Sequence, residues 1–371
     1  MNIKGNLKYI ITGSVIFLAI YMFVAAVPIG PDISFIPVWT HDIAASPALQ
    51  AIDAESKAKE TLNSDLFKNP ALESFILGNR FGYFLPDGTI IGSAETDLRV
   101  SASNSAWAVY SQEARDTKIF RPDGKLMMTA AGSGYVHLDG DRSYIFLPGG
   151  DAVSQYAKDG SVLWTREHTA PITAFNSSKA GTIIGYADGK ITCIRADGIE
   201  AFSFYPGGSN YQIILGAAIS EDGSLVACVS GIDRQRFILI SVKDDQYKIA
   251  YHAWLEGNLR EQAFVDFEKN GNFAFFQAPN GLGIADCKKR SVVFVPIDGK
   301  IHATGECPGD SLFVVLSGTE GNYTLSAIER PNHLIAKTSF RADNAFLIQR
   351  ETAIYLGMDR RISRIDIRGL E

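Results

Sequence analysis

The chain has 371 residues, of which 46% are apolar and 20% charged, and 35 Lys and Arg against 41 Asp and Glu leave a net charge of −6. This composition excludes a disordered chain, and the acidic balance argues against a nucleic-acid-binding protein, which would carry a basic patch. The four cysteines form no CxxC pair and are too few for a scaffold held by disulfides. Cys193, Cys228 and Cys287 lie in strand-like apolar stretches, and we interpret them as buried free thiols.

The first element in chain order is an uncharged stretch between Lys8 and Asp32. About 20 apolar residues, each rising ~1.5 Å, span the ~30 Å hydrocarbon core of a bilayer. We therefore predict a transmembrane signal anchor over residues 9–31, which contacts membrane lipid. A signal peptide cleaved near Val24-Ala25-Ala26 is the alternative, although the apolar run exceeds the usual signal core of about 7–15 residues.

The charges that flank this stretch set its expected orientation. Lys4 and Lys8 precede it, and basic residues stay on the cytoplasmic side of a membrane. We therefore expect residues 1–8 to be cytoplasmic and residues 32–371 to be extracytoplasmic, which means periplasmic if the organism is bacterial. The whole would be a single-pass membrane protein.

The rest of the chain repeats one phrase, in which a strand ends in an Asp-Gly turn and another strand follows. Asp-Gly supplies the positive φ of a tight hairpin turn, and the β-branched and aromatic residues on both sides favour strands. The glycines of the four clearest copies are spaced by 36, 36 and 38 residues: Gly88, Gly124, Gly160 and Gly198. Weaker copies follow near residues 243–245, 288–290, 330–332 and 368–369.

Each unit of the repeat holds four short strands. The clearest unit lies between Ser161 and Gly198, with strands expected near 162–165, 171–175, 182–186 and 190–194. Apolar runs of four or five residues fit inner strands that are covered on both faces, and they are too short for helices. Small sheets that cannot shield their own sides stack around an axis, so the pattern predicts an all-β propeller with four-stranded antiparallel blades.

The number of units predicts eight blades. If the first unit begins directly after the anchor, residues 35–40 match the first strand of the clearest unit and residues 46–52 match its second. The last unit ends without its fourth strand. We therefore expect residues 35–40 to pair with the C-terminal strands of 344–369 and to close the ring. A seven-bladed ring that begins near Leu72 is the alternative.

The phrase that ends at Trp164-Thr165 resembles the repeat of the quinoprotein-like β-propellers, and WD-repeat propellers are a close second. In the quinoprotein-like repeat the strand after the Gly turn carries a docking Trp, a structural role that the resemblance implies for Trp39 and Trp164. The superfamily includes quinone-dependent alcohol dehydrogenases and non-enzymatic periplasmic propellers, among them a lipoprotein that helps to assemble outer-membrane barrels. The adjacent Cys pair of the dehydrogenases is absent here, so the resemblance implies a fold and no active site.

No motif predicts a catalytic residue, a metal site or a cofactor. The six histidines lack metal-ligand spacing, and the GxSxG elbow and the phosphate-binding loop are both absent. We interpret His168 as a solvated loop residue, Ser56-Lys57-Ala58-Lys59 as a solvated segment, and Asp139-Gly140-Asp141 as a hairpin turn.

These observations favour a membrane-anchored extracytoplasmic propeller that is not an enzyme and that binds another protein or an envelope polymer through loops on rigid blades. The alternative is a quinoprotein-like enzyme or small-molecule sensor that uses the central funnel. We expect no nucleic-acid partner. The identity of the protein partner and the face of the ring that binds it stay open at this stage.

Overall fold

The computed structural model describes residues 12–18, 21, 33–51, 67, 69–111, 114–243, 246–308, 312–319 and 321–369. Within these ranges, residues 12–18 are helical with exposed side chains, and no helix is both long and apolar enough to cross a bilayer. The rest of the expected anchor over 9–31, apart from Tyr21, lies outside the described residues, as does the segment Ser56-Lys57-Ala58-Lys59.

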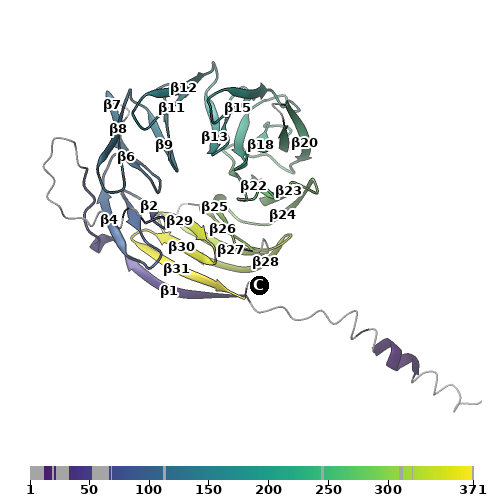
Figure 1. Cartoon of the computed structure of the whole chain (residues 1–371). Helices are drawn as coiled ribbons and strands as arrows, with labels where there is room; N and C mark the ends of the chain where they lie inside the picture. Colours follow the sequence, from purple (N-terminus) through teal and green to yellow (C-terminus); the bar gives the residue numbers. More distant parts are fainter. Residues whose placement is uncertain are drawn as a thin grey trace, which may run out of the picture.

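The strands form eight antiparallel sheets, or blades, arranged around one axis (Figure 1). The eight-bladed all-β ring predicted from the repeat is confirmed, and the seven-bladed alternative is wrong. We number the blades in chain order, and in each full blade the first strand lies nearest the axis. Blade 8 is completed by the first strand of the chain, which precedes a short 3-10 helix, η2 (Ile43–Ala45).

Blade 1 has β2 (Glu73–Leu77), β3 (Arg80–Phe84) and β4 (Ile90–Glu95), and blade 2 has β5 (Arg99–Ala102), β6 (Trp107–Tyr110), β7 (Asp116–Phe120) and β8 (Leu126–Ala131). Blade 3 has β9 (Tyr135–Asp139), β10 (Arg142–Phe146), β11 (Ala152–Tyr156) and β12 (Val162–Glu167). Blade 4 has β13 (Ile172–Ser178), β14 (Gly181–Tyr186), β15 (Ile191–Arg195) and β16 (Glu200–Phe204).

Blade 5 has β17 (Ile214–Ile219), β18 (Leu225–Ser230), β19 (Arg236–Lys243) and β20 (Gln246–Trp254), and blade 6 has β21 (Val265–Phe267), β22 (Phe273–Ala278), β23 (Gly281–Asp286) and β24 (Ser291–Val295). Blade 7 has β25 (Lys300–Glu306), β26 (Leu312–Thr319), β27 (Asn322–Glu329) and β28 (His333–Phe340). Blade 8 has β29 (Ala345–Arg350), β30 (Ala353–Met358), β31 (Arg361–Arg368) and β1 (Ser34–Asp42).

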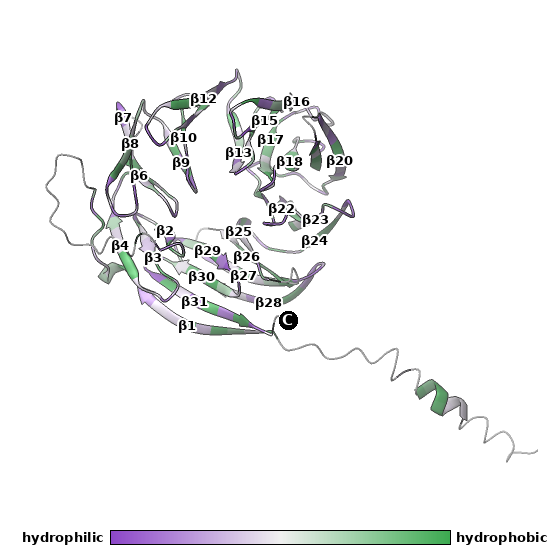
Figure 2. Cartoon of the chain, in the orientation of Figure 1, coloured by the Kyte–Doolittle hydropathy of each residue, from purple (hydrophilic) through white to green (hydrophobic). Residues whose placement is uncertain are grey.

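The hydrophobic core is divided among the contacts between blades. Among the described residues there are eight buried apolar clusters, and each joins the facing sides of two neighbouring blades. Apolar residues accordingly lie along the strands around the ring (Figure 2). Because a blade buries both of its faces in this way, its first and second strands are buried without alternation, as in β17 and β14, where every residue is buried.

The ring is closed by the two ends of the described body. β1 pairs antiparallel with β31, from Ser34 opposite Arg368 to Asp42 opposite Arg361. β1 is therefore the outer strand of a blade whose other three strands come from the C-terminal end of the chain. This pairing removes two open sheet edges at once.

Blade 1 differs from the others because it has three strands and lacks the inner one. Its last turn holds Gly88, and the corresponding turns at Gly124, Gly160 and Gly198 join the third and fourth strands of their blades. β2 is therefore equivalent to a second strand. Its direction agrees, since Glu73 at the start of β2 contacts Arg350 at the end of the inner strand β29.

The expectation that residues 46–52 form a strand equivalent to 171–175 is wrong. Pro47 and Leu49 instead run along the outer edge of β4, where Leu49 N donates to Ser93 O (2.7 Å) and Ser93 N donates to Pro47 O (2.9 Å). The buried side chain of Leu49 joins the cluster between blades 1 and 2. The segment therefore covers an exposed sheet edge and does not line the axis.

The alternation of strands gives the ring two chemically different faces. The inner strands end on the face that also carries the Asp-Gly turns and the paired residues Ser34 and Arg368, which we call the terminus face. They begin on the opposite face, which we call the distal face. The distal face carries the two long links at 205–213 and 255–264, whereas the turns of the terminus face are short.

Candidate functional site

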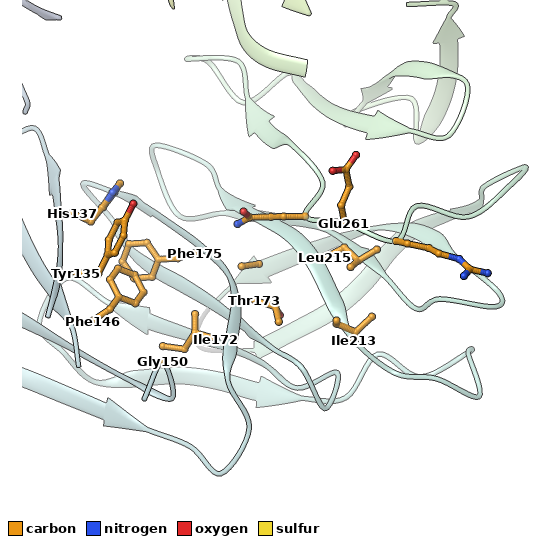
Figure 3. A pocket seen from close by; sticks show the side chains of 13 residues that line it. Tyr135, His137, Phe146, Gly150, Ile172, Thr173, Phe175, Ile213, Leu215 and Glu261 are labelled. Carbon is orange, nitrogen blue, oxygen red and sulfur yellow. The ribbon is translucent and has the colours of Figure 1, made fainter. Parts of the chain in front are cut away.

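The distal face opens into a mainly apolar cavity beside the axis, which we call the recess. Its volume is about 620 Å³, and it lies between the start of β9 on one side and the starts of β13 and β17 on the other. Tyr135, Phe146 and Phe175 line one side, and Leu215 and Glu261 line the other (Figure 3). A cavity of this size and lining is typical of a site that takes an apolar group.

Edge-on contacts between rings hold the aromatic wall of the recess in place. The ring of Phe175 lies edge-on to Phe146 (4.8 Å between centroids) and to His137 (5.4 Å). Burial lowers the pKa of His137, so its imidazole is neutral at pH 7. Tyr135 is half exposed, and the Arg99 guanidinium lies 5.0 Å from its ring centroid.

A smaller cavity of about 280 Å³ continues from the recess towards β25 and shares Phe175 and Gln262 with it. Its far side carries Lys300 and His302, and His302 Nε2 lies 3.2 Å from Gly318 O. The long link before β21 supplies Arg260 to the recess. The mouth of the central channel thus combines an apolar floor with a polar rim.

Large aromatic side chains stand exposed on the same face. Tyr205 is 51% exposed, Tyr211 69% and Trp254 44%. The guanidinium groups of Arg234 and Arg236 lie 4.7 Å and 5.4 Å from the ring of Trp254. Exposed aromatic residues near an apolar cavity are characteristic of binding surfaces, because they contribute large contact area at a small cost in conformational entropy.

His168 also lies on the distal face, but the interpretation of it as a solvated loop residue is wrong. Its Nε2 lies 2.7 Å from Asp188 Oδ2, its ring packs 4.5 Å from that of Tyr186, and its side chain is only 17% exposed. Tyr205 donates to the same carboxylate oxygen (3.1 Å). Through Asp188, His168 in the link before blade 4 is thus connected to Tyr205 in the link after it.

The terminus face opens into a second cavity, of about 880 Å³, which is charged. It lies where blade 1 lacks its inner strand and extends to the ends of β21, β25 and β29. Arg350 donates to the two oxygens of Glu73 at 2.5 and 2.9 Å, and Asn104 donates to Glu73 at 3.0 Å. This bidentate contact spans 277 positions of sequence and joins blade 8 to blade 1.

Asp266 is the carboxyl of this cavity with the most unusual environment. Its pKa is raised to about 6, mainly by burial and in smaller part by the carboxylates Glu306 and Asp139, while a hydrogen bond from Phe267 N (2.9 Å) acts to lower it. Within the described ranges no cation pairs with Asp266. Glu268, two residues further along the chain, pairs with Arg330 (3.0 Å).

The residues singled out in the sequence lie at the contacts between blades. Gly88, Gly124, Gly160 and Gly198 all have positive φ and form turns on the terminus face. Trp39 on β1 donates to Pro86 O (3.2 Å), in the turn that contains Gly88. Trp164 on β12 packs against the turn of Gly198 in the next blade. None of these six residues lines the recess.

The structure places the other patterns outside any metal site. In the described part of the chain no group of three or more His, Cys, Asp or Glu side chains is arranged to hold a metal ion. Asp139-Gly140-Asp141 forms the hairpin turn between β9 and β10, as expected. The four cysteines are free; Cys193, Cys228 and Cys307 are buried and Cys287 is half-buried.

Sequence reasoning found neither cavity. The recess brings together residues between positions 135 and 262, and their separations along the sequence form no recognisable motif. The one usable signal was the excess of aromatic residues in the links at 205–213 and around 254, next to links that are longer than a hairpin turn requires.

Comparison with known proteins agrees with this architecture. The sequence profile of a family described as beta-propeller protein matches residues 1–371. The chain belongs to this family. A protein of Treponema pallidum (strain Nichols), named "Uncharacterized protein", is 40% identical over 370 residues, which cover 100% of this chain and 97% of the relative.

Two solved structures share the fold of this beta-propeller protein. BamB from Moraxella catarrhalis superposes with a TM-score of 0.59 at 9% identity, covering 90% of this chain and 100% of that one. A chain of the Mitotic Checkpoint Complex superposes with a TM-score of 0.52 at 14% identity, covering 71% and 88%. At such low identity these matches support a β-propeller and nothing more specific about the quinoprotein-like resemblance.

Proposed function

We propose that the chain is a membrane-anchored extracytoplasmic propeller that acts without catalysis, by binding a protein of the cell envelope on its distal face. The apolar run over residues 9–31 is the proposed anchor, with residues 1–8 in the cytoplasm. Ser34, where the ring begins, lies on the terminus face. An anchor joined there directs the terminus face towards the bilayer and the distal face away from it.

The observation that carries this proposal is the chemistry of the distal face. It combines the recess of about 620 Å³ with the exposed side chains of Tyr205, Tyr211 and Trp254. Protein interfaces derive most of their binding energy from a few aromatic or Arg side chains and the apolar pockets that receive them. The similarity to BamB supports the propeller fold and does not carry the argument.

The test is capture of a partner from solubilised membranes by the full-length chain. A distal variant carries Tyr205→Ser, Tyr211→Ser and Trp254→Ser. A control variant changes three exposed residues of the terminus face: Arg121→Ser, Lys158→Ser and Lys288→Ser. We expect the wild type and the control to retain the same partner and the distal variant to lose it. Equal capture by all three, or repeated absence of any partner, contradicts the proposal.

A second candidate function is small-molecule sensing or catalysis in the charged cavity of the terminus face. Asp266 supports it, because a carboxyl with a pKa near 6 in a cavity is suited to binding a cation or transferring a proton. The test is a thermal-shift titration of the purified chain with pyrroloquinoline quinone and with small amines. Stabilisation of the wild type that Asp266→Asn abolishes supports this function, and absence of any shift removes it.

A further inference from the structure

The rim of the recess carries an excess of positive charge. Arg260 and Lys300 are exposed, line the two connected cavities, and make no ion pair within the described ranges. Glu261 is the carboxylate at the same rim, and it also makes no ion pair among the described residues. With His137 neutral, the described residues that line the two connected cavities include two cations, Arg260 and Lys300, and one carboxylate, Glu261.

The floor of the recess suits an aromatic or large aliphatic side chain. The recess is lined there by the rings of Phe146 and Phe175 and by the side chains of Ile172, Ile213 and Leu215. Burial of an apolar side chain contributes about 25 cal/mol for each Å² removed from water. A charged group at the floor would lose its hydration without gaining a partner, because the charged side chains among the described lining residues are Arg260, Glu261 and Lys300 at the rim.

We propose that the recess binds a segment of a partner protein in which an aromatic side chain is flanked by carboxylates. The aromatic group enters between Phe146 and Leu215, and the carboxylates reach Arg260 and Lys300 at the rim. The inference rests on the proposed function of the distal face and adds the chemistry of the segment that is recognised. The unpaired charges of the rim select acidic segments over basic ones.

Glu261 is expected to oppose the binding of an acidic segment. It repels an acidic segment from the same rim on which Arg260 attracts it, so neutralising the two neighbours has opposite effects. Contacts between rim charges are screened by salt, with a Debye length of about 10 Å at 0.1 M. Binding of an acidic segment should therefore weaken as ionic strength rises.

The experiment measures binding of three labelled heptapeptides to the purified full-length chain by fluorescence anisotropy. The first has a central tryptophan with two aspartates on each side, the second replaces the aspartates with lysines, and the third replaces the tryptophan with alanine. We expect the first to bind, and the second and third to bind at least about tenfold more weakly.

Charge variants of the chain locate the site of binding. Arg260→Glu and Lys300→Glu should each weaken the acidic peptide about five- to tenfold, whereas Glu261→Gln should strengthen it about twofold. Lys288→Glu, an exposed site on the terminus face, is the matched control and should change nothing. Ile213→Asp places a carboxylate on the floor and should abolish binding; its melting temperature reports whether it folds.

Three outcomes overturn the inference: preference for the lysine peptide, no binding of either charged peptide, or equal effects of Arg260→Glu and Lys288→Glu. The proposed function is tested separately by partner capture. If the chain captures a partner and Arg260→Glu and Lys300→Glu leave that capture intact, the distal face binds in another way and only this inference fails. If no partner is captured, the proposed function fails as well.

Discussion

Trp164 holds the outer strand of blade 3 against the turn of blade 4. Its side chain is 7% exposed and packs on Gly198, whereas Trp254 on the equivalent strand of blade 5 is 44% exposed. Truncating a buried Trp costs about 3–5 kcal/mol, so Trp164→Ala should lower the free energy of unfolding by that amount. Trp254→Ala is the matched control, with a loss below about 1 kcal/mol. Urea denaturation measures both, and equal losses would refute the docking role.

The turn that receives Trp164 requires glycine for two reasons. Gly198 has φ +82°, and an added Cβ would lie 2.6 Å from the Trp164 ring. Gly140 also has positive φ, +52°, but a Cβ there meets nothing within 4 Å. Gly140→Ala should therefore cost about 1 kcal/mol from backbone strain alone, and Gly198→Ala at least about 1 kcal/mol more. Equal melting temperatures for the two variants would contradict this reading.

Asp266 makes stability depend on pH. Its pKa is raised from 3.8 to about 6, so the folded chain retains a proton that the unfolded chain has already released. Stability from this group is therefore lost as pH rises from about 4 to about 6, by at most about 3 kcal/mol at ~1.4 kcal/mol per pKa unit. Asp266→Asn should remove that decline in denaturation curves at pH 4, 5, 6 and 7. An unchanged profile would show that Asp266 titrates normally.

At the scale of elements, the pairing of β1 with β31 makes the ring one cooperative unit. A chain without residues 1–42 loses the outer strand of blade 8, whereas a chain without residues 1–32 keeps it. The shorter chain should melt at least about 10 °C lower, because blade 8 loses the pairing of β1 with β31 and the packing of Phe35 and Trp39, which together contribute several kcal/mol. Differential scanning calorimetry of the two chains measures this. Coincident transitions would show that closure contributes nothing.

The elements also show which parts of the fold were predictable. The Asp-Gly turns and apolar runs gave the strands of most blades, because turn chemistry and strand burial are local properties. Residues 46–52 looked like an inner strand by composition. Pro47 and Leu49 instead lie along the outer edge of β4, where their backbone pairs with Ser93, and this pairing depends on a sheet edge more than 40 residues away.

On the scale of the whole molecule, the candidate sites could not be predicted. Glu73 and Arg350 are 277 positions apart, and they meet because the ring brings its first and last blades together. The charged cavity beside them exists because blade 1 lacks an inner strand. The aromatic residues of the distal face were visible in the sequence, but their convergence on one side of the ring depends on strand directions that only the assembled blades define.

We propose above all that the ring presents its distal face, away from the proposed anchor, to an envelope protein. Site-specific photo-crosslinking in intact cells tests this most directly, with benzoylphenylalanine placed at Tyr211 on the distal face or at Asp197 on the terminus face of the same blade. Both positions are exposed. We expect a discrete protein adduct from position 211 and none of that mass from position 197. An adduct from position 197 alone, or from neither position, would contradict the account.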